Sequence, residues 1–331
     1  MNIFHYSKHY GTIQDFSNII RDFDSNIKLK TKKGAATHED FIIDSKKADI
    51  IWEENKEDFL NNEYILFSDS TPCSWAVLKN LDKIKSNQKI ILWIVMKFDY
   101  AIEDNIEYYN LLNKIKNDSR IYFLYSSPFY KIHLNCYVKD IPVQNEFLFF
   151  PYGKRLKSDY PCKNTTFYNN LYVMSYENET KFYPLIEELN KYNIKYDQKI
   201  NRTPEEEYCG PFEIKNCPAI IHIPYAWSTM AFSEYISLGK TFILPSIEWL
   251  RKNYQKTNIW FQNSKNLDII EKYSLWYMEE HKKCFIYFND ISEIPNLCTE
   301  TNLKNKQKEC KILANKILKN NLNILNTIIK K

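Results

Sequence analysis

The stretch Ala219–Ser246, AIIHIPYAWSTMAFSEYISLGKTFILPS, decides the fold of this chain. Its first residues, Ala219–Ile223, form a short apolar run closed by a proline, as in a buried parallel strand. Met230–Leu238 has helical periodicity, hydroxyl residues precede it as N-caps, and Gly239 is placed to end it in a left-handed conformation. Thr241–Leu244 is a second apolar run. The stretch therefore predicts strand, helix and strand in succession, as in an α/β domain that binds a nucleotide diphosphate.

Bulk composition narrows the class of protein. A length of 331 residues predicts two domains, and 44% hydrophobic with 26% charged residues is typical of a soluble globular protein. The net charge of +4 is spread along the chain, whereas a nucleic-acid-binding surface needs clustered charge. The eight cysteines form no CxxC pair, which favours buried thiols in a reducing compartment over a zinc site. The chain shows no signal-type N-terminus and no apolar run approaching ~18 residues, so a cytoplasmic location is expected.

Strands and helices are predicted to alternate along the first half of the chain. Tyr64–Phe67, Lys89–Met96 and Arg120–Tyr125 are apolar runs that each end in a polar loop, and a further strand is predicted at Asp49–Trp52. Such alternation indicates a parallel, doubly wound sheet. Function is then expected in the loops at the carboxyl edge of the sheet.

The same series restarts in the second half, with a strand at Leu171–Ser175 and, further on, a helix over Leu267–Glu280. We therefore expect an α/β fold of two Rossmann-like doubly wound domains facing a cleft. The predicted boundaries are 1–152 for the first domain, 153–301 for the second, and 302–331 for an amphipathic C-terminal helix that packs back on the protein.

Three groups of residues carry a resemblance to a known class of enzymes: Ile223–Met230 (IPYAWSTM), Glu234 and the pair Pro245-Ser246. Together they resemble the donor-binding segment of GT-B glycosyltransferases. Two doubly wound domains joined by a proline-glycine turn and followed by a long C-terminal helix also resemble the plan of that class. The resemblance implies an enzyme that moves a sugar from a UDP- or GDP-type nucleotide sugar to a glycan or other hydroxyl acceptor. It names no particular sugar family.

The resemblance implies that Ser228 and Thr229 meet the diphosphate and that Glu234 binds the ribose. The unpaired N–H groups and the dipole at a helix N-terminus favour an anion there. Glu234 lies about 7.5 Å further along the axis, at 1.5 Å per residue, and its side chain leans back toward the helix start. The alternatives are ordinary helix capping for the hydroxyls and a solvent-facing carboxylate for Glu234.

Further donor-binding candidates lie in loops around this segment and in the first domain. Two aromatic residues border it, an arginine follows a strand as a bidentate partner for phosphate, and two polar residues follow the first strand of the second domain. A glycine-threonine pair in the first domain allows close approach to the backbone, and a lysine lies at the turn between domains. Rim packing and ordinary surface positions are the alternatives. These candidates are Tyr225, Trp227, Arg202, Glu177, Asn178, Gly11, Thr12 and Lys154.

A catalytic base is expected from the loops of the first domain, since an inverting transferase must accept a proton from the acceptor hydroxyl. Asp69 follows a strand in FSDSTP, and Asp99 follows the most strongly apolar strand. Their structural alternatives are a turn residue bonded to its own backbone for Asp69 and a helix N-cap for Asp99. The sequence shows no carboxylate pair suited to a metal-diphosphate site. No cofactor and no metal requirement are therefore expected.

Two other functions remain open. Nucleotide-sugar epimerases share the GT-B plan, and a catalytically silent nucleotide-sugar- or glycan-binding protein is compatible with the absence of an unambiguous base. The expected partners are a nucleotide-sugar donor and a glycan or glycoconjugate acceptor, but no nucleic acid. The lysines of the terminal helix are compatible with a weak peripheral contact between this helix and an anionic membrane. Its alternative is to pack on the first domain with its lysines in solvent.

Overall fold

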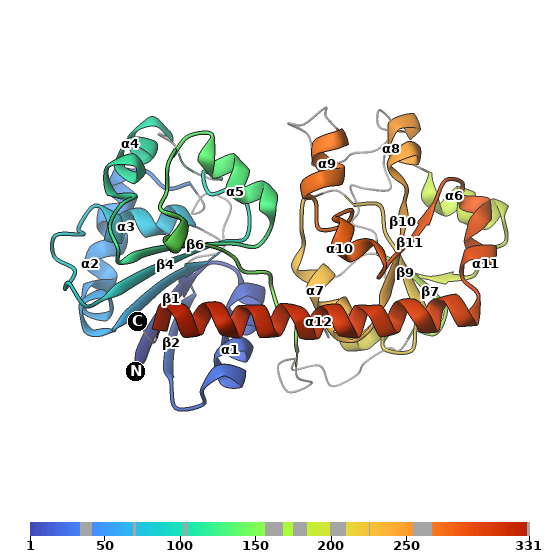
Figure 1. Ribbon diagram of the computed structural model, residues 1–331, viewed down its shortest axis with the longest axis horizontal. Coiled ribbons are helices and arrows are strands. Elements are labelled where there is room, and N and C mark those ends of the chain that lie inside the picture. The colour runs from blue at the N-terminus through green and yellow to red at the C-terminus, as the bar shows by residue number, and fades with distance from the viewer. Residues whose placement is uncertain are drawn as a thin grey trace. The chain divides into compact units, whose positions relative to one another are not determined.

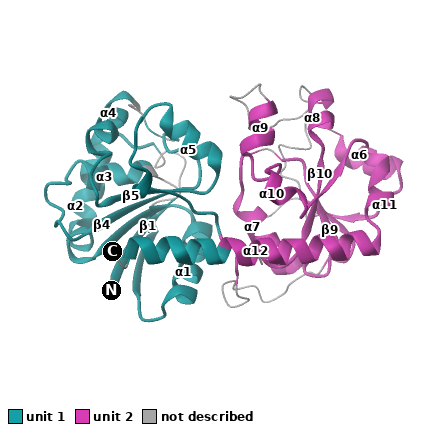
Figure 2. Ribbon diagram, viewed as in Figure 1, with its two compact units in different colours: residues 1–151, 318–331 teal, residues 152–317 magenta. Residues whose placement is uncertain are grey.

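The computed structural model describes residues 1–33, 42–68, 71–100, 102, 105–155, 168–174, 184–198, 210–224, 226–253 and 267–329. The chain divides into two compact units (Figure 2). Unit 1 comprises Met1–Pro151 and Leu318–Lys331, and unit 2 comprises Tyr152–Ile317. Each unit contains a parallel sheet flanked by helices (Figure 1), which confirms the predicted α/β fold with two Rossmann-like domains.

The six strands of unit 1 are all parallel and lie in the order β2-β1-β3-β4-β5-β6. The chain runs from β1 outward to β2 and then crosses back to β3, so the sheet has its topological switch point between β1 and β3. Ligands of doubly wound sheets bind outside the carboxyl ends of the strands at such a point. The strands are β1 (Asn2–Ser7), β2 (Lys28–Lys33), β3 (Tyr64–Ser68), β4 (Lys89–Ile94), β5 (Ile121–Tyr125) and β6 (Glu146–Leu148).

Helices cover both faces of this sheet. Figure 1 shows α1 and the last turns of α12 on one side, with α2, α4 and α5 on the other. Right-handed crossovers require this arrangement, because the chain leaves β1 in one direction and makes all its later crossovers in the opposite direction. The helices are α1 (Tyr10–Phe23), α2 (Ser45–Asn61), α3 (Trp75–Leu78), α4 (Asn105–Ile115) and α5 (Pro128–Asn135), with 3₁₀ turns η2 (Thr71–Ser74) and η3 (Val143–Asn145).

Unit 2 repeats this topology with five parallel strands in the order β11-β10-β9-β7-β8. Its first strand, β7, lies between the second and third strands of the unit, so its switch point lies between β7 and β9. The strands are β7 (Leu171–Val173), β8 (Tyr196–Asp197), β9 (Ala219–Ile221), β10 (Thr241–Pro245) and β11 (Ile286–Phe288).

The β9–α7–β10 segment of unit 2 has the strand, helix and strand that its sequence predicts. α7 ends before Gly239, whose φ of +72° is the left-handed conformation expected of a glycine at that position. The helices of the unit are α6 (Leu185–Lys191), α7 (Met230–Ser237), α8 (Ile247–Asn253), α9 (Leu267–Tyr273), α10 (Glu279–Lys282) and α11 (Ile294–Leu297), with 3₁₀ turns η5 (Gly210–Ile214) and η7 (Ile291–Glu293).

Helix α12 (Glu300–Ile329) belongs to both units (Figure 2). Within unit 2, Gln307 donates from Nε2 to the Pro218 carbonyl at 2.8 Å. Within unit 1, the buried Asn321 donates from Nδ2 to the Phe150 carbonyl at 2.7 Å, and Lys89 donates from Nζ to the Ile328 carbonyl at 2.8 Å. A cation bonded to the last carbonyls of a helix also opposes the negative end of its dipole. The last turns of α12 are therefore an integral part of unit 1.

Aromatic residues fill the core on the α1 side of the unit 1 sheet and the core around α7 in unit 2. Trp93 lies with its ring centroid 6.2 Å from that of Phe16 and 5.5 Å from that of Phe149, and its Nε1 donates to the Phe149 carbonyl. In unit 2, Phe242 meets the ring of Trp276 edge-on at 5.2 Å. These large rings bury much apolar surface and satisfy their polar atoms, as stable aromatic cores require.

Two elements differ from their predictions. The segment Asp49–Trp52, predicted as a strand, lies within α2, which begins after Asp44, the N-cap residue whose side chain accepts a hydrogen bond from the Lys47 N–H. The buried residues of α2 recur at helical spacing, which the short window around residue 50 conceals. The helix predicted over Leu267–Glu280 is interrupted after α9 by a turn that leads into α10.

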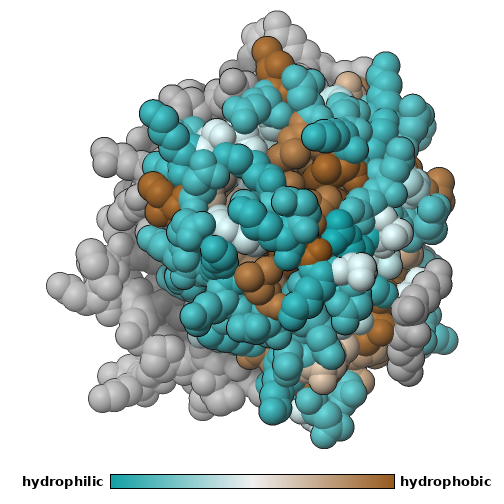
Figure 3. Space-filling view, turned by 90° about the vertical axis from the view of Figure 1, so that its left-hand side faces the viewer, coloured by the Kyte–Doolittle hydropathy of each residue, from teal (hydrophilic) through white to brown (hydrophobic). Residues whose placement is uncertain are grey.

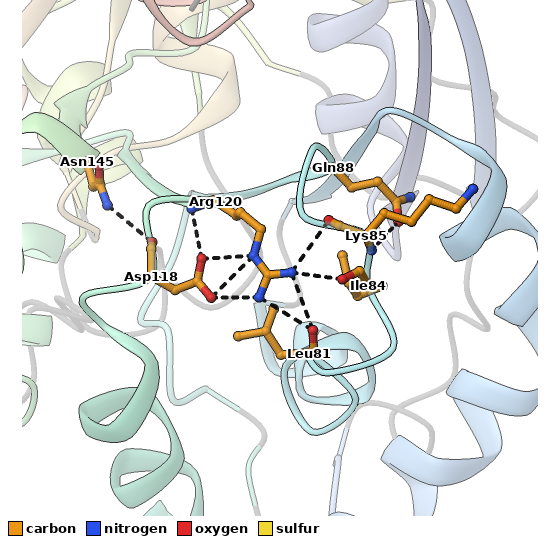
Figure 4. Close-up of polar contacts among 7 residues, drawn as sticks. All are labelled: Leu81, Ile84, Lys85, Gln88, Asp118, Arg120 and Asn145. Atoms are coloured by element: carbon orange, nitrogen blue, oxygen red, sulfur yellow. Dashed lines mark hydrogen bonds and ion pairs between the residues drawn. The ribbon is translucent and has the colours of Figure 1, made fainter.

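Arg120 ties together two loops at the amino edge of the unit 1 sheet (Figure 4). Its guanidinium lies 2.7 Å from Oδ2 of Asp118 and donates to the carbonyls of Leu81 and Ile84. The hydrogen bonds from Arg120 hold the pKa of the Asp118 carboxyl below its ordinary value, against the smaller opposing effect of burial. Arg120 therefore fixes the turn between α3 and β4 against the start of β5.

Replacing Arg120 with alanine is expected to lower the free energy of unfolding by about 1.5–3 kcal/mol, the usual effect of losing hydrogen bonds to a charged donor. Urea denaturation followed by tryptophan fluorescence measures it. Arg251 is a matched control, since it pairs with Asp268 at 2.6 Å but both side chains are more than half exposed. Arg251→Ala is expected to change stability by no more than about 0.5 kcal/mol. Equal effects of the two variants would contradict the role given to Arg120.

Candidate functional site

The segment after β9 lies at the switch point of unit 2, where the order of the strands reverses. Residues 226 and 227 are held there by the turn between α9 and α10. The Trp227 carbonyl accepts a hydrogen bond from the Leu275 N–H at 3.0 Å, and the Trp276 ring donates from Nε1 to the Ala226 carbonyl at 2.8 Å. The indole of Trp227 is itself buried. These contacts fix the backbone that leads into α7.

Thr229 is the N-cap of α7, as its sequence predicts. Its backbone is extended, and its Oγ1 accepts a hydrogen bond from the Phe232 N–H at 3.1 Å. Ser228, immediately before it, is largely buried. The cap satisfies one of the N–H groups of the first turn, and the helix dipole still favours an anion at this end. The arrangement is thus chemically suited to a phosphate group.

Glu234, predicted to bind ribose, is buried and forms an ion pair with Arg155. Nη2 of Arg155 lies 2.9 Å from Oε1 of Glu234, Nε of Arg155 donates to the same oxygen at 3.1 Å, and the two side chains are 1% and 7% exposed. Glu234 is therefore not the solvent-facing carboxylate of the structural alternative. Arg155 lies beside Lys154 at the turn between the predicted domains, and the spacing of the sequence does not reveal that it pairs with Glu234.

Gly153 brings this arginine to the helix. Its φ is +73°, and a Cβ built on it would lie 2.0 Å from the carbonyl carbon of Ser233. The Ser237 hydroxyl donates to the Gly153 carbonyl at 3.0 Å. The backbone at Gly153 thus runs directly against α7, and the neighbouring Lys154 places its Nζ 5.9 Å from the centre of the Tyr152 ring.

The switch point of unit 1 holds a cluster of buried hydroxyl groups around Thr12. Its Oγ1 lies 2.8 Å from Oγ of Ser7, accepts a hydrogen bond from Ser68 Oγ at 3.0 Å and donates to the His9 carbonyl. Ser68 Oγ also lies 2.7 Å from Nε2 of His5, whose burial lowers its pKa to about 3 and keeps the imidazole neutral. Thr12 is therefore engaged within the protein.

The glycine-threonine pair lies in a helix rather than in the loop expected from the sequence. Gly11 and Thr12 fall in the first turn of α1, which begins at Tyr10. The N-cap residue His9 makes no side-chain capping hydrogen bond. Gly11 is partly exposed, so its backbone is nearer to solvent than that of Thr12.

Asp99 lies after β4 and contacts two side chains from different helices. Its Oδ1 is 2.9 Å from Nε2 of His133 on α5, and its Oδ2 accepts a hydrogen bond from the hydroxyl of Tyr109 on α4 at 2.6 Å. Burial alone would raise the pKa of Asp99, but the hydrogen bonds from His133 and Tyr109 outweigh it and hold the pKa below the ordinary value. The carboxyl group is therefore ionised at neutral pH.

Aromatic rings surround the imidazole of His133. The ring of Phe129 is nearly parallel to it at a centroid distance of 6.0 Å, and Tyr137 meets it edge-on at 5.4 Å. Tyr137 also stacks on Tyr109 at 4.4 Å. Neither His133 nor Tyr109 stands out in the sequence, since a lone histidine or tyrosine on a helix is more often structural.

Several of the predicted site residues lie outside the described part of the chain, and their positions stay predictions. They are the catalytic candidate Asp69 and the donor-binding candidates Tyr225, Arg202, Glu177 and Asn178.

Neither a cluster of metal ligands nor a membrane span is found in the described part of the chain. No group of three or more His, Cys, Asp and Glu side chains is placed there to hold a metal ion. No helix of the described residues combines the length and the apolar character needed to cross a bilayer. Exposed apolar side chains of unit 1 include Ile106, Ile132 and Val143, and the face seen in Figure 3 shows hydrophobic residues interspersed with more numerous hydrophilic ones.

A scan against models of protein families and a search of curated proteins each found no match to this chain.

Proposed function

We propose that the chain is a glycosyltransferase that takes a sugar from a UDP- or GDP-type nucleotide sugar and transfers it to a hydroxyl group of a glycan or glycoconjugate. The supporting observation is the start of α7, capped by Thr229 and fixed by contacts to residues 226–227, at the switch point of unit 2. The diphosphate of the donor would meet the N–H groups of the first turn, where the helix dipole offsets negative charge. Transfer would then need no metal ion.

The buried Arg155–Glu234 pair supports the same placement of the donor. The ion pair links Arg155, near the start of unit 2, to the first two turns of α7. The ribose would lie toward Glu234 when the diphosphate lies at the helix start, because the carboxylate follows the cap along the axis. Ser228 and Lys154 flank this region in sequence and are the next candidates for contact with the donor.

A charge placed in the first turn of α7 tests this proposal. Ala231 is partly exposed at this turn. An aspartate there favours the helix dipole but repels a diphosphate, so Ala231→Asp is expected to keep the fold and abolish nucleotide binding. Ala231→Asn has nearly the same shape without the charge and is the matched control. Saturating nucleotide diphosphate is expected to raise the Tm of the wild type and of the control by about 5–10 °C, since ligand at 100-fold its Kd stabilises by about 2.7 kcal/mol.

The screen uses UDP, GDP, TDP and CMP compounds, in EDTA and again with magnesium. Stabilisation of Ala231→Asp equal to that of the control would place the diphosphate elsewhere, and failure of every nucleotide to raise the wild-type Tm would contradict the proposal. Formation of an isomeric nucleotide sugar in the absence of an acceptor would instead identify an epimerase.

A further inference from the structure

Two buried thiols of unit 2, those of Cys284 and Cys310, lie against each other. Cys284 precedes β11 by two residues, and Cys310 lies on the first half of α12. The Cys310 thiol lies 3.4 Å from the Cys284 carbonyl, to which it donates, and it also forms a hydrogen bond with the Cys284 thiol. Both thiols are free, and the two residues are 1% and 0% exposed. A pair of sulfur atoms therefore joins α12 to the start of β11.

The backbone around this pair is fixed by further hydrogen bonds. The Cys284 N–H donates to the His281 carbonyl at 2.9 Å, and the Cys284 carbonyl also accepts a hydrogen bond from Oγ1 of Thr241 at 2.6 Å. On α12, Gln307 lies one turn before Cys310 and is bonded to the Pro218 carbonyl. These bonds hold the two sulfurs together in the folded unit, so closing a disulfide bond between them requires only a small movement of the sulfur atoms.

The two thiols differ in acidity. The hydrogen bond from Cys310 holds the pKa of the Cys284 thiol below its ordinary value, against the opposing effect of burial. The same hydrogen bond, together with burial, raises the pKa of the Cys310 thiol well above its ordinary value, because its proton is engaged. The charges of Lys306 and Lys283 favour the Cys284 thiolate, and that of Glu309 opposes it. The thiolate is the nucleophile in thiol oxidation, so Cys284 is the sulfur that reacts first.

We propose that Cys284 and Cys310 form a reversible disulfide bond that fastens α12 to β11 when the protein meets a small oxidant such as hydrogen peroxide. The Cys284 thiolate attacks a peroxide oxygen and becomes a sulfenic acid, the O–O bond breaks, and the hydroxide released takes up the thiol proton and leaves as water. The Cys310 sulfur then bonds to that of Cys284, its proton passes to the departing oxygen, and a second water leaves. Two protons and two electrons thus pass from the thiols to the peroxide.

The position of the pair suits a small oxidant. Lys283 and Lys311, the neighbours of the two cysteines in sequence, are exposed, so the buried sulfurs adjoin the surface. A peroxide is small enough for such a position, whereas a bulky thiol reagent needs local opening of the structure. In the reducing compartment that the sequence predicts, disulfides are usually transient and redox-sensing. The bond is independent of the function proposed above, because it involves neither the start of α7 nor a nucleotide.

Oxidation of the full chain followed by mapping of its thiols tests the inference. The protein is treated with hydrogen peroxide, the remaining thiols are alkylated, and the unreduced digest is analysed by mass spectrometry. We expect two peptides that are joined through Cys284 and Cys310, lack two hydrogen atoms and separate in dithiothreitol. The closed loop restricts the unfolded chain, so the Tm of the oxidised protein should rise by about 5–10 °C and return on reduction.

Two serine variants separate this pair from the other cysteines. Cys310→Ser removes the second sulfur, so the cross-link and the rise in Tm should both disappear while Cys284 accumulates as a sulfenic acid that dimedone labels. Cys298→Ser is the matched control, because Cys298 lies between the two in sequence and is more exposed than either. It should change neither readout.

Recovery of Cys284 and Cys310 as free thiols from the oxidised wild type, or a cross-link from either to another cysteine, would overturn the inference. Oxidation confined to the exposed Cys136 would also overturn it, because exposure rather than contact between sulfurs would then govern the reaction. A cross-link that leaves the Tm unchanged would contradict the fastening of α12. Each of these outcomes leaves nucleotide binding by unit 2 unaffected.

Discussion

Gly153→Ala is expected to destabilise unit 2 by at least about 3 kcal/mol, the sum of a left-handed backbone penalty and of overpacking against α7. The added Cβ would lie 2.0 Å from the carbonyl carbon of Ser233 and 2.3 Å from the backbone nitrogen of Glu234. Both are backbone atoms of a helix, so neither can move without displacing α7. Urea denaturation followed by circular dichroism measures the loss.

Gly239→Ala provides a matched control for this variant. Gly239 has nearly the same φ, +72°, but the atoms nearest to its added Cβ belong to the flexible side chain of Lys311, the first at 2.6 Å. Gly239→Ala should therefore lower the free energy of unfolding only by the penalty of a left-handed backbone, about 1–2 kcal/mol. If the two alanine variants lose the same stability, the close approach of Gly153 to α7 is not present in solution.

Arg155→Met is the second variant with a large expected effect. It leaves Glu234 buried without the guanidinium that lies 2.9 Å from its Oε1. Removing one partner of a buried ion pair destabilises by about 3–5 kcal/mol, whereas replacing both partners with apolar residues is often neutral. Arg155→Met is thus expected to cost several times more than the double variant Arg155→Met/Glu234→Met. Urea denaturation of the two single variants and the double variant at neutral pH completes the cycle.

Strictly additive effects in this cycle would show that the pair does not interact. Glu234→Ala alone is an ambiguous test of the proposed donor site, because it removes the proposed ribose ligand and at the same time removes the carboxylate that pairs with the buried Arg155. A loss of nucleotide affinity in Glu234→Ala is therefore informative only beside Arg155→Met, which perturbs the pair but retains the carboxylate.

Much of the fold was accessible from the sequence, because proline, glycine and apolar runs mark where elements begin and end. The segment β9–α7–β10 follows its prediction closely, including the cap at Thr229 and the left-handed Gly239. The strand predicted at Asp49–Trp52 was wrong, since the pattern of four residues cannot distinguish a strand from one buried turn of a long helix. The order of the strands has no local signal in the sequence, because it depends on which elements meet across the sheet.

The candidate site was less accessible, because its side chains interact across long separations in sequence. Glu234 and Asp99 stand out by their positions after a cap and after a strand, whereas their pairing with Arg155 and His133 does not. Periodicity and spacing report local structure, so they cannot reveal that a carboxylate is already engaged. The burial of Glu234 and the engagement of both oxygens of Asp99 required the tertiary structure.

The division of α12 between the two units has a consequence for how the chain acquires its structure during synthesis on the ribosome. Domains generally fold in order from the N-terminus as they emerge. Here Met1–Pro151 emerges first but lacks the residues from Leu318 onward. These include the buried Leu325 and Ile328, and Asn321, which donates a hydrogen bond to the Phe150 carbonyl. All of unit 2 is translated before these residues appear. Unit 1 therefore begins to form first and is completed last, and in the interval α1 alone covers the face of the sheet that it later shares with α12.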